Sequence, residues 1–196
     1  MKMLQFTMAA LIAITSVQKV SAQTFAAGKS GLYLTAADFV QNKISYEINC
    51  SGNDKLQVHA LFGSSTVTVV QNGQKKAFPK KQLYGYRDCH NRNYRFFNGD
   101  AYLVTDTAGF FVYSATKTEA GPHGKGWVKS DKYYFSTGGD APLQLLTIDN
   151  LKKAFPANHR FQYELEGVCK TDKDLVDYDV YTKSYRVKYL FSQSTK

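Results

Sequence analysis

The sequence predicts an α+β domain in which an antiparallel β meander, or a partly closed barrel, is covered by C-terminal helices. Three observations support this prediction. Apolar and polar residues alternate with period two between residues 44 and 145, and turn residues interrupt the pattern about every ten residues. Two Asn-Gly pairs, which favour tight hairpin turns, fall inside this region. From residue 147 onward the apolar spacing changes to that of helices.

The N-terminus has the pattern of a cleavable signal peptide over residues 1–22. Lys2 makes the start positive, residues 3–17 form an apolar run, and Val20-Ser21-Ala22 places small residues before a cleavage site. A membrane-spanning helix needs about 20 apolar residues, whereas this run is shorter and meets Lys19. We therefore predict export to the periplasm or the extracellular space, with no membrane span in the mature chain.

The chain after the leader is expected to form one globular domain. A spacer at residues 23–30 precedes this domain, which covers residues 31–196 and is long enough to bury a core. Residues 31–146 are predicted to be β-rich and residues 147–196 helical. The first elements are a short strand at 31–34 and a short helix that begins with the capping-box pair Thr35 and Asp38.

Three hairpins are predicted in the β-rich part, and two of them fix the strand register. Asn72-Gly73 and Asn98-Gly99 tolerate the two positive φ angles of a type I′ turn. Counting outward from these turns gives the pairs Gln71 with Gln74, Val67 with Phe78, Val69 with Lys76, Tyr94 with Leu103, Phe96 with Ala101, Arg95 with Tyr102 and Phe97 with Asp100. The third hairpin covers residues 133–145, turns at Gly138-Gly139 and has an edge strand marked by Pro142.

The register places Tyr94, Phe96 and Leu103 on one apolar face, which we expect to touch the helical layer. Arg95 and Tyr102 share the opposite face.

Three helices are predicted in the C-terminal part. Thr147 opens the first, which Pro156 ends, and residues 158–166 form the second. Thr171 caps the last and longest. Its apolar stripe has helical spacing and consists of Leu175, Tyr178, Thr182, Tyr185 and Tyr189. We expect this stripe to lie on the sheet, and a short coiled-coil contact with a partner is the weaker alternative.

The charge of the chain is strongly positive, with a formal net charge of +9 that falls to about +7 when Lys2 and Lys19 leave with the leader. Such an excess favours anionic surfaces such as lipopolysaccharide, acidic glycans or nucleic acid. Lysine dominates the basic residues, however, and this favours a solubilising surface over ordered recognition of an anion. The partners that we expect are an envelope glycan, an anionic lipid or a protein, and no specific nucleic-acid motif is present.

The three cysteines, Cys50, Cys89 and Cys169, all follow the leader, so an exported chain can oxidise two of them. Three pairings are open. Cys50–Cys89 is favoured because both residues lie at ends of predicted strands, whereas Cys169 lies in the helical tail.

The best candidate binding surface is the polar cluster from Tyr84 to Arg95, with a loop at residues 87–93 between two strands. Aromatic residues are frequent from residue 84 to 135, and Lys75, Lys76, Lys80 and Lys81 precede them. Aromatic rings beside cations can stack on sugars while the cations hold anions. The candidate residues are Tyr84, Tyr86, Arg87, His90, Arg92, Arg95, Tyr102 and Trp127.

Catalytic and metal-binding patterns are weak. Cys89 adjoins His90, but neighbouring residues of a strand point to opposite sides, and an exported cysteine tends to be oxidised. The glycine-rich segment from Gly121 to Trp127 could bring His123 to a ligand, although a plain hairpin loop is the simpler interpretation. The four histidines lie far apart without metal-ligand spacing, so neither a metal nor a cofactor is expected.

Three segments follow the leader in a characteristic order: Leu34-Thr-Ala-Ala-Asp-Phe39, the block from Tyr84 to Phe97, and the helix from Leu146 to Pro156. In this order they resemble uncharacterised exported bacterial proteins, a resemblance that implies no activity. We therefore expect an exported, non-enzymatic domain with a binding or structural role at the bacterial cell envelope. The alternative is a secreted hydrolase or redox enzyme that uses Cys89 or His123.

Overall fold

The computed structural model describes residues 30–58, 64–121 and 126–196. The predicted leader, most of the spacer and the histidines at positions 59 and 123 lie outside these ranges. Within them the chain is an α+β fold with antiparallel sheets of eight, three and two strands, as the sequence predicts, and the large sheet does not close into a barrel.

The large sheet has the strand order β11-β10-β9-β8-β7-β6-β1-β2, so strands β6 to β11 form a meander in chain order. Its members are β1 (Ser30–Tyr33), β2 (Tyr46–Ile48), β6 (Gly85–Arg87), β7 (Asn93–Phe97), β8 (Asp100–Asp106), β9 (Phe111–Ala120), β10 (Trp127–Ser136) and β11 (Gln144–Leu145). Gly85 permits close pairing of β6 with β7, because a Cβ atom there would lie 1.9 Å from the carbonyl oxygen of Tyr94.

The hairpin registers predicted from the two Asn-Gly turns are confirmed at every pair. Asn72 and Gly73 have φ angles of 51° and 78°, and Asn98 and Gly99 have 50° and 85°. The first turn joins β4 (Thr66–Gln71) to β5 (Gln74–Pro79), which form the three-stranded sheet with β3 (Lys55–Val58). The third hairpin is also present, and β11 is the edge strand of the large sheet.

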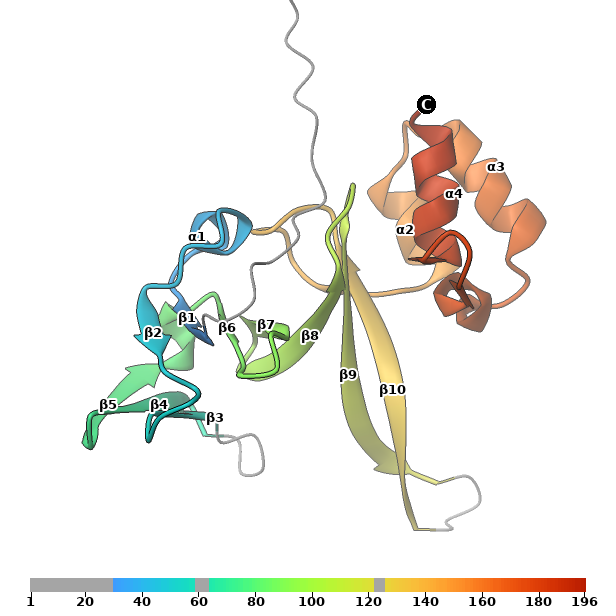
Figure 1. Ribbon diagram of the computed structural model, residues 1–196. Helices are drawn as coiled ribbons and strands as arrows, with labels where there is room; N and C mark the ends of the chain where they lie inside the picture. Colours follow the sequence, from blue (N-terminus) through green and yellow to red (C-terminus); the bar gives the residue numbers. More distant parts are fainter. Residues whose placement is uncertain (1–29, 59–63, 122–125) are drawn as a thin grey trace, which may run out of the picture.

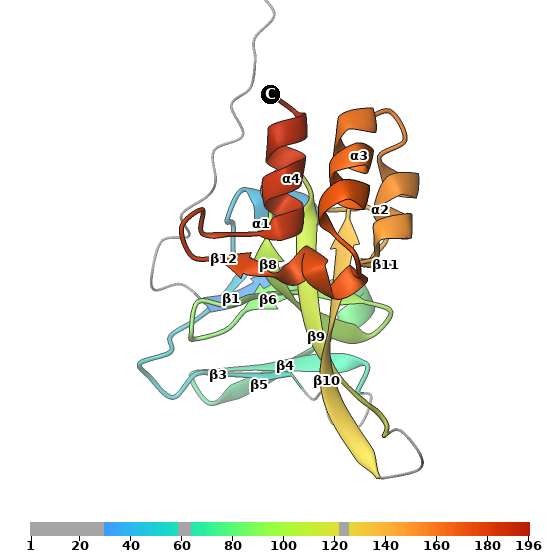
Figure 2. The ribbon, with the colours of Figure 1, turned by 90° about the vertical axis from the view of Figure 1, so that its right-hand side faces the viewer.

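The apolar face that carries Tyr94 and Phe96 packs against the three-stranded sheet, not against the helices. Phe96 shares a core cluster with Val67, Val69 and Phe78, and Tyr94 packs at its margin. The three-stranded sheet lies at one end of the molecule and the C-terminal helices lie at the other (Figures 1 and 2). The expectation that Tyr94, Phe96 and Leu103 touch the helical layer was therefore wrong, because a second sheet supplies the apolar cover.

The helices pack beside one end of the β9–β10 hairpin, where β9 begins and β10 ends, and the other half of the hairpin extends away from them (Figures 1 and 2). They are α2 (Ile148–Ala154), α3 (His159–Val168) and α4 (Arg186–Ser194). Phe110, Val112 and Phe135 from this part of the chain share one core cluster with Leu151 of α2 and Phe161 of α3. No helix within the described ranges is long and apolar enough to cross a membrane.

The long helix predicted after Thr171 is wrong. The chain instead forms a 3₁₀ turn, η3 (Asp172–Val176), a small hairpin of β12 (Tyr178–Asp179) and β13 (Ser184–Tyr185), and only then α4. Asp179 breaks the helix, because its Oδ1 atom accepts the backbone N–H groups of Tyr181 and Thr182 at 2.7 and 3.1 Å. Lys183 follows with a φ angle of 51°. The tyrosine stripe is thus divided between the hairpin and α4.

Two short helical elements complete the fold. α1 (Ala36–Val40) begins with the predicted capping box, in which Thr35 and Asp38 each bond the other's backbone N–H. η1 (Lys80–Gln82) connects β5 to the large sheet.

A basic groove as the candidate functional site

The loop between β6 and β7 is held by one carboxylate and one disulfide. Asp88 Oδ1 accepts the backbone N–H groups of His90 and Arg92, both at 2.9 Å, and its Oδ2 lies 2.7 Å from two nitrogens of the Arg92 guanidinium. Cys89 is bonded to Cys50, as predicted, with a Cα–Cα distance of 5.6 Å. The loop is therefore fixed in place, with His90 and Arg92 exposed.

Arg87 does not belong to this exposed surface, since its relative accessibility is only 1%. Its Nε donates to Asn93 Oδ1 at 3.1 Å, its guanidinium contacts Asn42, and it lies over the Tyr33 ring. Desolvation by burial lowers the pKa of Arg87. The prediction that Arg87 lines a binding surface was wrong, because β6 continues through this residue and turns its side chain inward.

Arg95 is likewise buried, with an accessibility of 5%. Its guanidinium donates to Tyr113 Oη at 3.0 Å, to Ser136 Oγ at 3.3 Å and to the carbonyl oxygen of Ala141 at 2.9 Å. It also lies over the Tyr84 ring, 5.3 Å from the centroid. Hydroxyl, carbonyl and aromatic groups of the large sheet satisfy this cation, so the predicted role in surface binding was wrong here too.

The three tyrosines of the predicted surface are also core residues. Tyr84, Tyr86 and Tyr102 are all buried, and burial is the main cause that raises the pKa of each phenol. Tyr86 stacks on Tyr94 with the ring centroids 4.6 Å apart, and Tyr102 meets Tyr134 edge-on. Of the eight candidate residues, only His90, Arg92 and Trp127 remain exposed.

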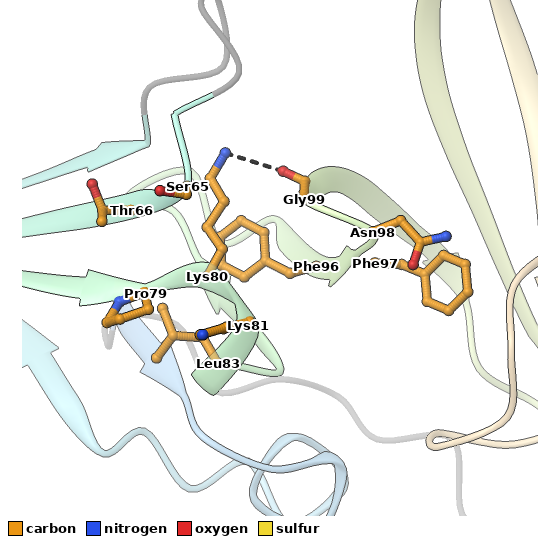
Figure 3. Close-up of a pocket in the computed structure, with 10 residues that line it drawn as sticks. All are labelled: Ser65, Thr66, Pro79, Lys80, Lys81, Leu83, Phe96, Phe97, Asn98 and Gly99. Atoms are coloured by element: carbon orange, nitrogen blue, oxygen red, sulfur yellow. Dashed lines mark hydrogen bonds between the residues drawn. The ribbon is translucent and has the colours of Figure 1, made fainter.

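A groove made of two hollows lies beside the turn between β7 and β8. The first hollow lies between this turn and the three-stranded sheet and has a volume of about 650 Å³. Side chains from both sheets surround it (Figure 3). The lining consists of Ser65, Thr66, Pro79, Lys80, Lys81, Leu83, Phe96, Phe97, Asn98 and Gly99. η1 contributes Lys80 and Lys81 to this lining, and the β7–β8 turn contributes Asn98 and Gly99.

A second hollow of about 410 Å³ adjoins the first, since Lys80 and Gly99 line both. Its other walls come from Tyr94, Leu103 and Lys117 on the middle strands of the large sheet, from Arg92 in the β6–β7 loop and from Val58 at the end of β3. Tyr94 and Leu103, which were expected under the helices, therefore stand half-buried on the wall of this hollow. Together the two hollows form what we call the basic groove.

Lys80 divides the two hollows. Its backbone N–H donates to the carbonyl oxygen of Ser65 at 2.8 Å, and its ammonium donates to the carbonyl oxygen of Gly99 at 3.1 Å. The same ammonium lies 5.8 Å from the centroid of the Phe96 ring. This side chain, which is 5% exposed, bridges the turn of the large sheet and the end of β5 (Figure 3) and so forms the wall between the two hollows.

The lining of the basic groove carries Lys80, Lys81, Arg92 and Lys117. Asp88, just outside the lining, pairs with Arg92, and Asp100 within it pairs with Lys117, so four cations stand against two carboxylates. The Lys117 ammonium lies 2.6 Å from Asp100 Oδ2, and this hydrogen bond raises the pKa of Lys117. An excess of positive charge in a hollow with low-dielectric walls focuses its field on a ligand. The groove is therefore suited to an anion.

Among the described residues we looked for a nucleophile and for metal ligands. In the disulfide Cys89 is not a free thiolate nucleophile. Cys169 is a buried thiol whose pKa is raised by burial. Among the described residues, no group of three His, Cys, Asp or Glu side chains is placed to hold a metal ion. His123 lies outside the described ranges, and Trp127 is exposed at the start of β10 and lines neither hollow.

No family model, curated protein or solved structure matches this chain.

The sequence pattern does not single out the lysines of the groove. Lys80 and Lys81 stand among the basic residues near the aromatic region but are not among the candidate site residues, and neither is Lys117. The β8–β9 register brings Lys117 opposite Asp100, because Leu103 pairs with Ser114. A bulge between Val104 and Asp106 shifts that register near the turn, so counting from the sequence could not reach the pair.

Proposed function

We propose that this chain is an exported, non-enzymatic domain that binds an acidic glycan of the bacterial cell envelope in the basic groove. The observation that carries the proposal is the convergence of Lys80, Lys81, Arg92 and Lys117 on two adjoining hollows, where only Asp88 and Asp100 offset their charge. Ser65, Thr66 and Asn98 add hydroxyl and amide groups to the first hollow. Cations beside hydroxyl and amide groups suit a ligand that carries both negative charge and sugar hydroxyls.

The Cys50–Cys89 disulfide supports the exported location. Disulfides form and persist in oxidising compartments such as the periplasm and the extracellular space. Both sulfur-bearing residues are exposed, so the bond would meet reductants in a cytoplasm. Together with the leader pattern at residues 1–22, this supports the cell envelope as the place where the groove meets its ligand.

The test is a binding panel of acidic envelope glycans and anionic lipid vesicles, measured at low and at physiological salt. The variant Lys81→Gln/Arg92→Gln/Lys117→Gln removes three exposed or half-exposed cations of the groove without touching the core. Each surface charge contact is weak by itself, so the three are removed together, and we expect acidic-glycan binding to weaken by about tenfold or more. Binding of the parent protein should also fall as salt is added.

A matched control is Lys129→Gln/Lys153→Gln/Lys173→Gln, which removes the same charge from exposed positions outside the groove. We expect this variant to retain most of the binding. Equal losses in both variants would mean that net charge alone attracts the glycan, and the groove assignment would fail. Preference for lipid vesicles over acidic glycans would contradict the proposed ligand class.

A further inference from the structure

A separate hollow of about 540 Å³ lies between the β12–β13 hairpin and α4, and it shares no residue with the basic groove. Its lining combines aromatic rings with hydrogen-bonding groups. The members are Val168, Asp177, Tyr178, Asp179, Val180, Tyr181, Thr182, Arg186, Tyr189 and Leu190. We call it the tyrosine hollow.

The aromatic residues of the tyrosine hollow are not part of the core. Tyr181 is 94% exposed, and Tyr178 and Tyr189 are also exposed. The core in this region is supplied by other residues, Leu175, Val187 and Leu190, which are buried against the sheet. Large apolar rings in water need an explanation beyond folding when several gather in one hollow.

The hairpin that carries these rings is held firmly. The backbone N–H of Arg186 donates to the carbonyl oxygen of Asp177 at 2.8 Å, and the Arg186 guanidinium lies 2.9 Å from Asp177 Oδ2. Tyr178 pairs with Tyr185 across the hairpin, with ring centroids 5.5 Å apart and nearly perpendicular planes. Tyrosine loses little side-chain entropy on binding, so rings on a fixed hairpin form a prepared surface.

The polar groups of the tyrosine hollow are also oriented in advance. Two backbone N–H groups hold Asp179 Oδ1, and the ion pair with Arg186 holds the Asp177 carboxylate at the rim. Thr182 places a hydroxyl in the same lining. Two carboxylates against one guanidinium leave this hollow without the positive charge that marks the basic groove, and this disfavours an anion.

From these features we propose that the tyrosine hollow is a binding site for a neutral oligosaccharide. A pyranose ring offers an apolar C–H face that packs on exposed aromatic rings, and its hydroxyls donate to fixed carboxylates. The arrangement of Tyr178, Tyr181 and Tyr189 around Asp177 and Asp179 supplies both kinds of contact. The proposal rests on residues remote from the basic groove, so it stands or falls independently of the function proposed there.

The size of the hollow is that of a small-ligand pocket. Ligand pockets have volumes of about 300–1,000 Å³. The hollow falls inside this range. The lining also lacks the cluster of basic residues that an acidic protein partner would require.

The experiment is a titration of the whole protein with linear neutral gluco- and chito-oligosaccharides of about three to six units, read by tyrosine fluorescence and by calorimetry. We expect Tyr181→Ala and Tyr178→Ala each to weaken binding by about two- to tenfold. Tyr181→Phe should keep most of the affinity, because the ring remains. Tyr163→Ala is the matched control, since Tyr163 is an exposed tyrosine on α3 outside the hollow.

Two results would overturn the proposal. The first is that none of these oligosaccharides binds the parent protein, or that Tyr181→Ala binds them as tightly as Tyr163→Ala does. The second is that light scattering shows a dimer that Tyr181→Ala converts to a monomer, because a second copy of the chain would then cover the rings. Folding of each variant is checked by the cooperative unfolding transition, which these exposed positions should leave unchanged.

Discussion

Removing the Cys50–Cys89 disulfide is expected to destabilise the fold mainly through the unfolded chain. The bond closes a loop with a sequence separation of 39, and this loop contains the whole three-stranded sheet. Both cysteines are exposed, so their replacement by serine removes almost no buried surface. The double variant Cys50→Ser/Cys89→Ser therefore isolates the effect of the cross-link.

The magnitude follows from loop closure. A cross-link over this separation reduces the entropy of the unfolded chain by an amount worth about 4 kcal/mol at 25 °C, and measured values fall mostly between about 2 and 4 kcal/mol. For a domain of this size, 1 kcal/mol shifts the melting temperature by about 2–4 °C. We expect the double variant to melt about 5–15 °C below the parent.

The assay is urea and thermal unfolding of the mature chain with and without reductant. Reductant should lower the stability of the parent to that of the double variant, and it should leave the double variant unchanged. Thiol titration of the unfolded parent should find one free cysteine, Cys169. A parent whose unfolding midpoint ignores reductant, or which shows three free thiols, would refute both the cross-link and the oxidising compartment that it supports.

Two further predictions concern buried cations. Burial lowers the pKa of Lys188 to about 8, against the opposing effect of Asp106, so the unfolded chain binds more protons between pH 8 and the ordinary lysine pKa. The free energy of unfolding should therefore rise by about 2 kcal/mol from about pH 7.5 to about pH 9.5. Urea titrations of Lys188→Met should lack this rise, and an identical pH slope in parent and variant would contradict it. The pH range ends below about pH 10. Above that pH the phenols ionise in the unfolded chain but not in the folded protein, where burial raises the pKa of Tyr84 and Tyr86, so the free energy of unfolding falls. For Arg95, truncation to alanine should cost about 3–5 kcal/mol through a cavity and unpaired polar groups, whereas Arg95→Met should cost less. Thermal melts decide this, and a stable Arg95→Ala protein with weakened glycan binding would restore Arg95 to the binding surface.

The parts of the fold that local chemistry determines could be predicted from the sequence. Asn98 and Gly99 adopt positive φ angles at low cost, so the turn by itself places Tyr94 opposite Leu103. The capping box of α1 depends only on Thr35 and Asp38. In both cases the decisive interaction lies within a few residues of the chain.

The burial of polar residues could not be predicted in this way. Alternation shows correctly that Arg95 and Phe96 face opposite sides of the sheet, but it assigns a charged residue to the exposed side. The Arg95 guanidinium is satisfied by Tyr113, Ser136 and Ala141, which lie 18 to 46 residues away in the chain. Only the assembled sheet creates that environment, so no local pattern could reveal it.

In the C-terminal segment the apolar spacing predicted the wrong secondary structure. Spacing alone favours one helix through Tyr178 and Tyr185, because an apolar stripe at helical period is present. Asp179 instead accepts hydrogen bonds from the backbone N–H groups of Tyr181 and Thr182. In addition, Asp, Tyr, Val and Thr are all weak helix formers. A side-chain interaction over two residues thus outweighs a pattern that extends over roughly fifteen residues, and it leaves the rings exposed.

Two of the arginines serve the interior of the fold and not the groove, and this bears on how the groove can bind. Arg87 and Arg95 lie inside, where a planar guanidinium can satisfy several donors with carbonyl, amide and hydroxyl oxygens and still stack on rings. The groove relies mainly on lysines, which are strongly hydrated and impose little geometry on an anion. Its selectivity must then come from the spacing of the charges and from the shape of the two hollows. Loss of one lysine should therefore matter little, whereas loss of three cations should abolish the preference for a charged glycan over a neutral one.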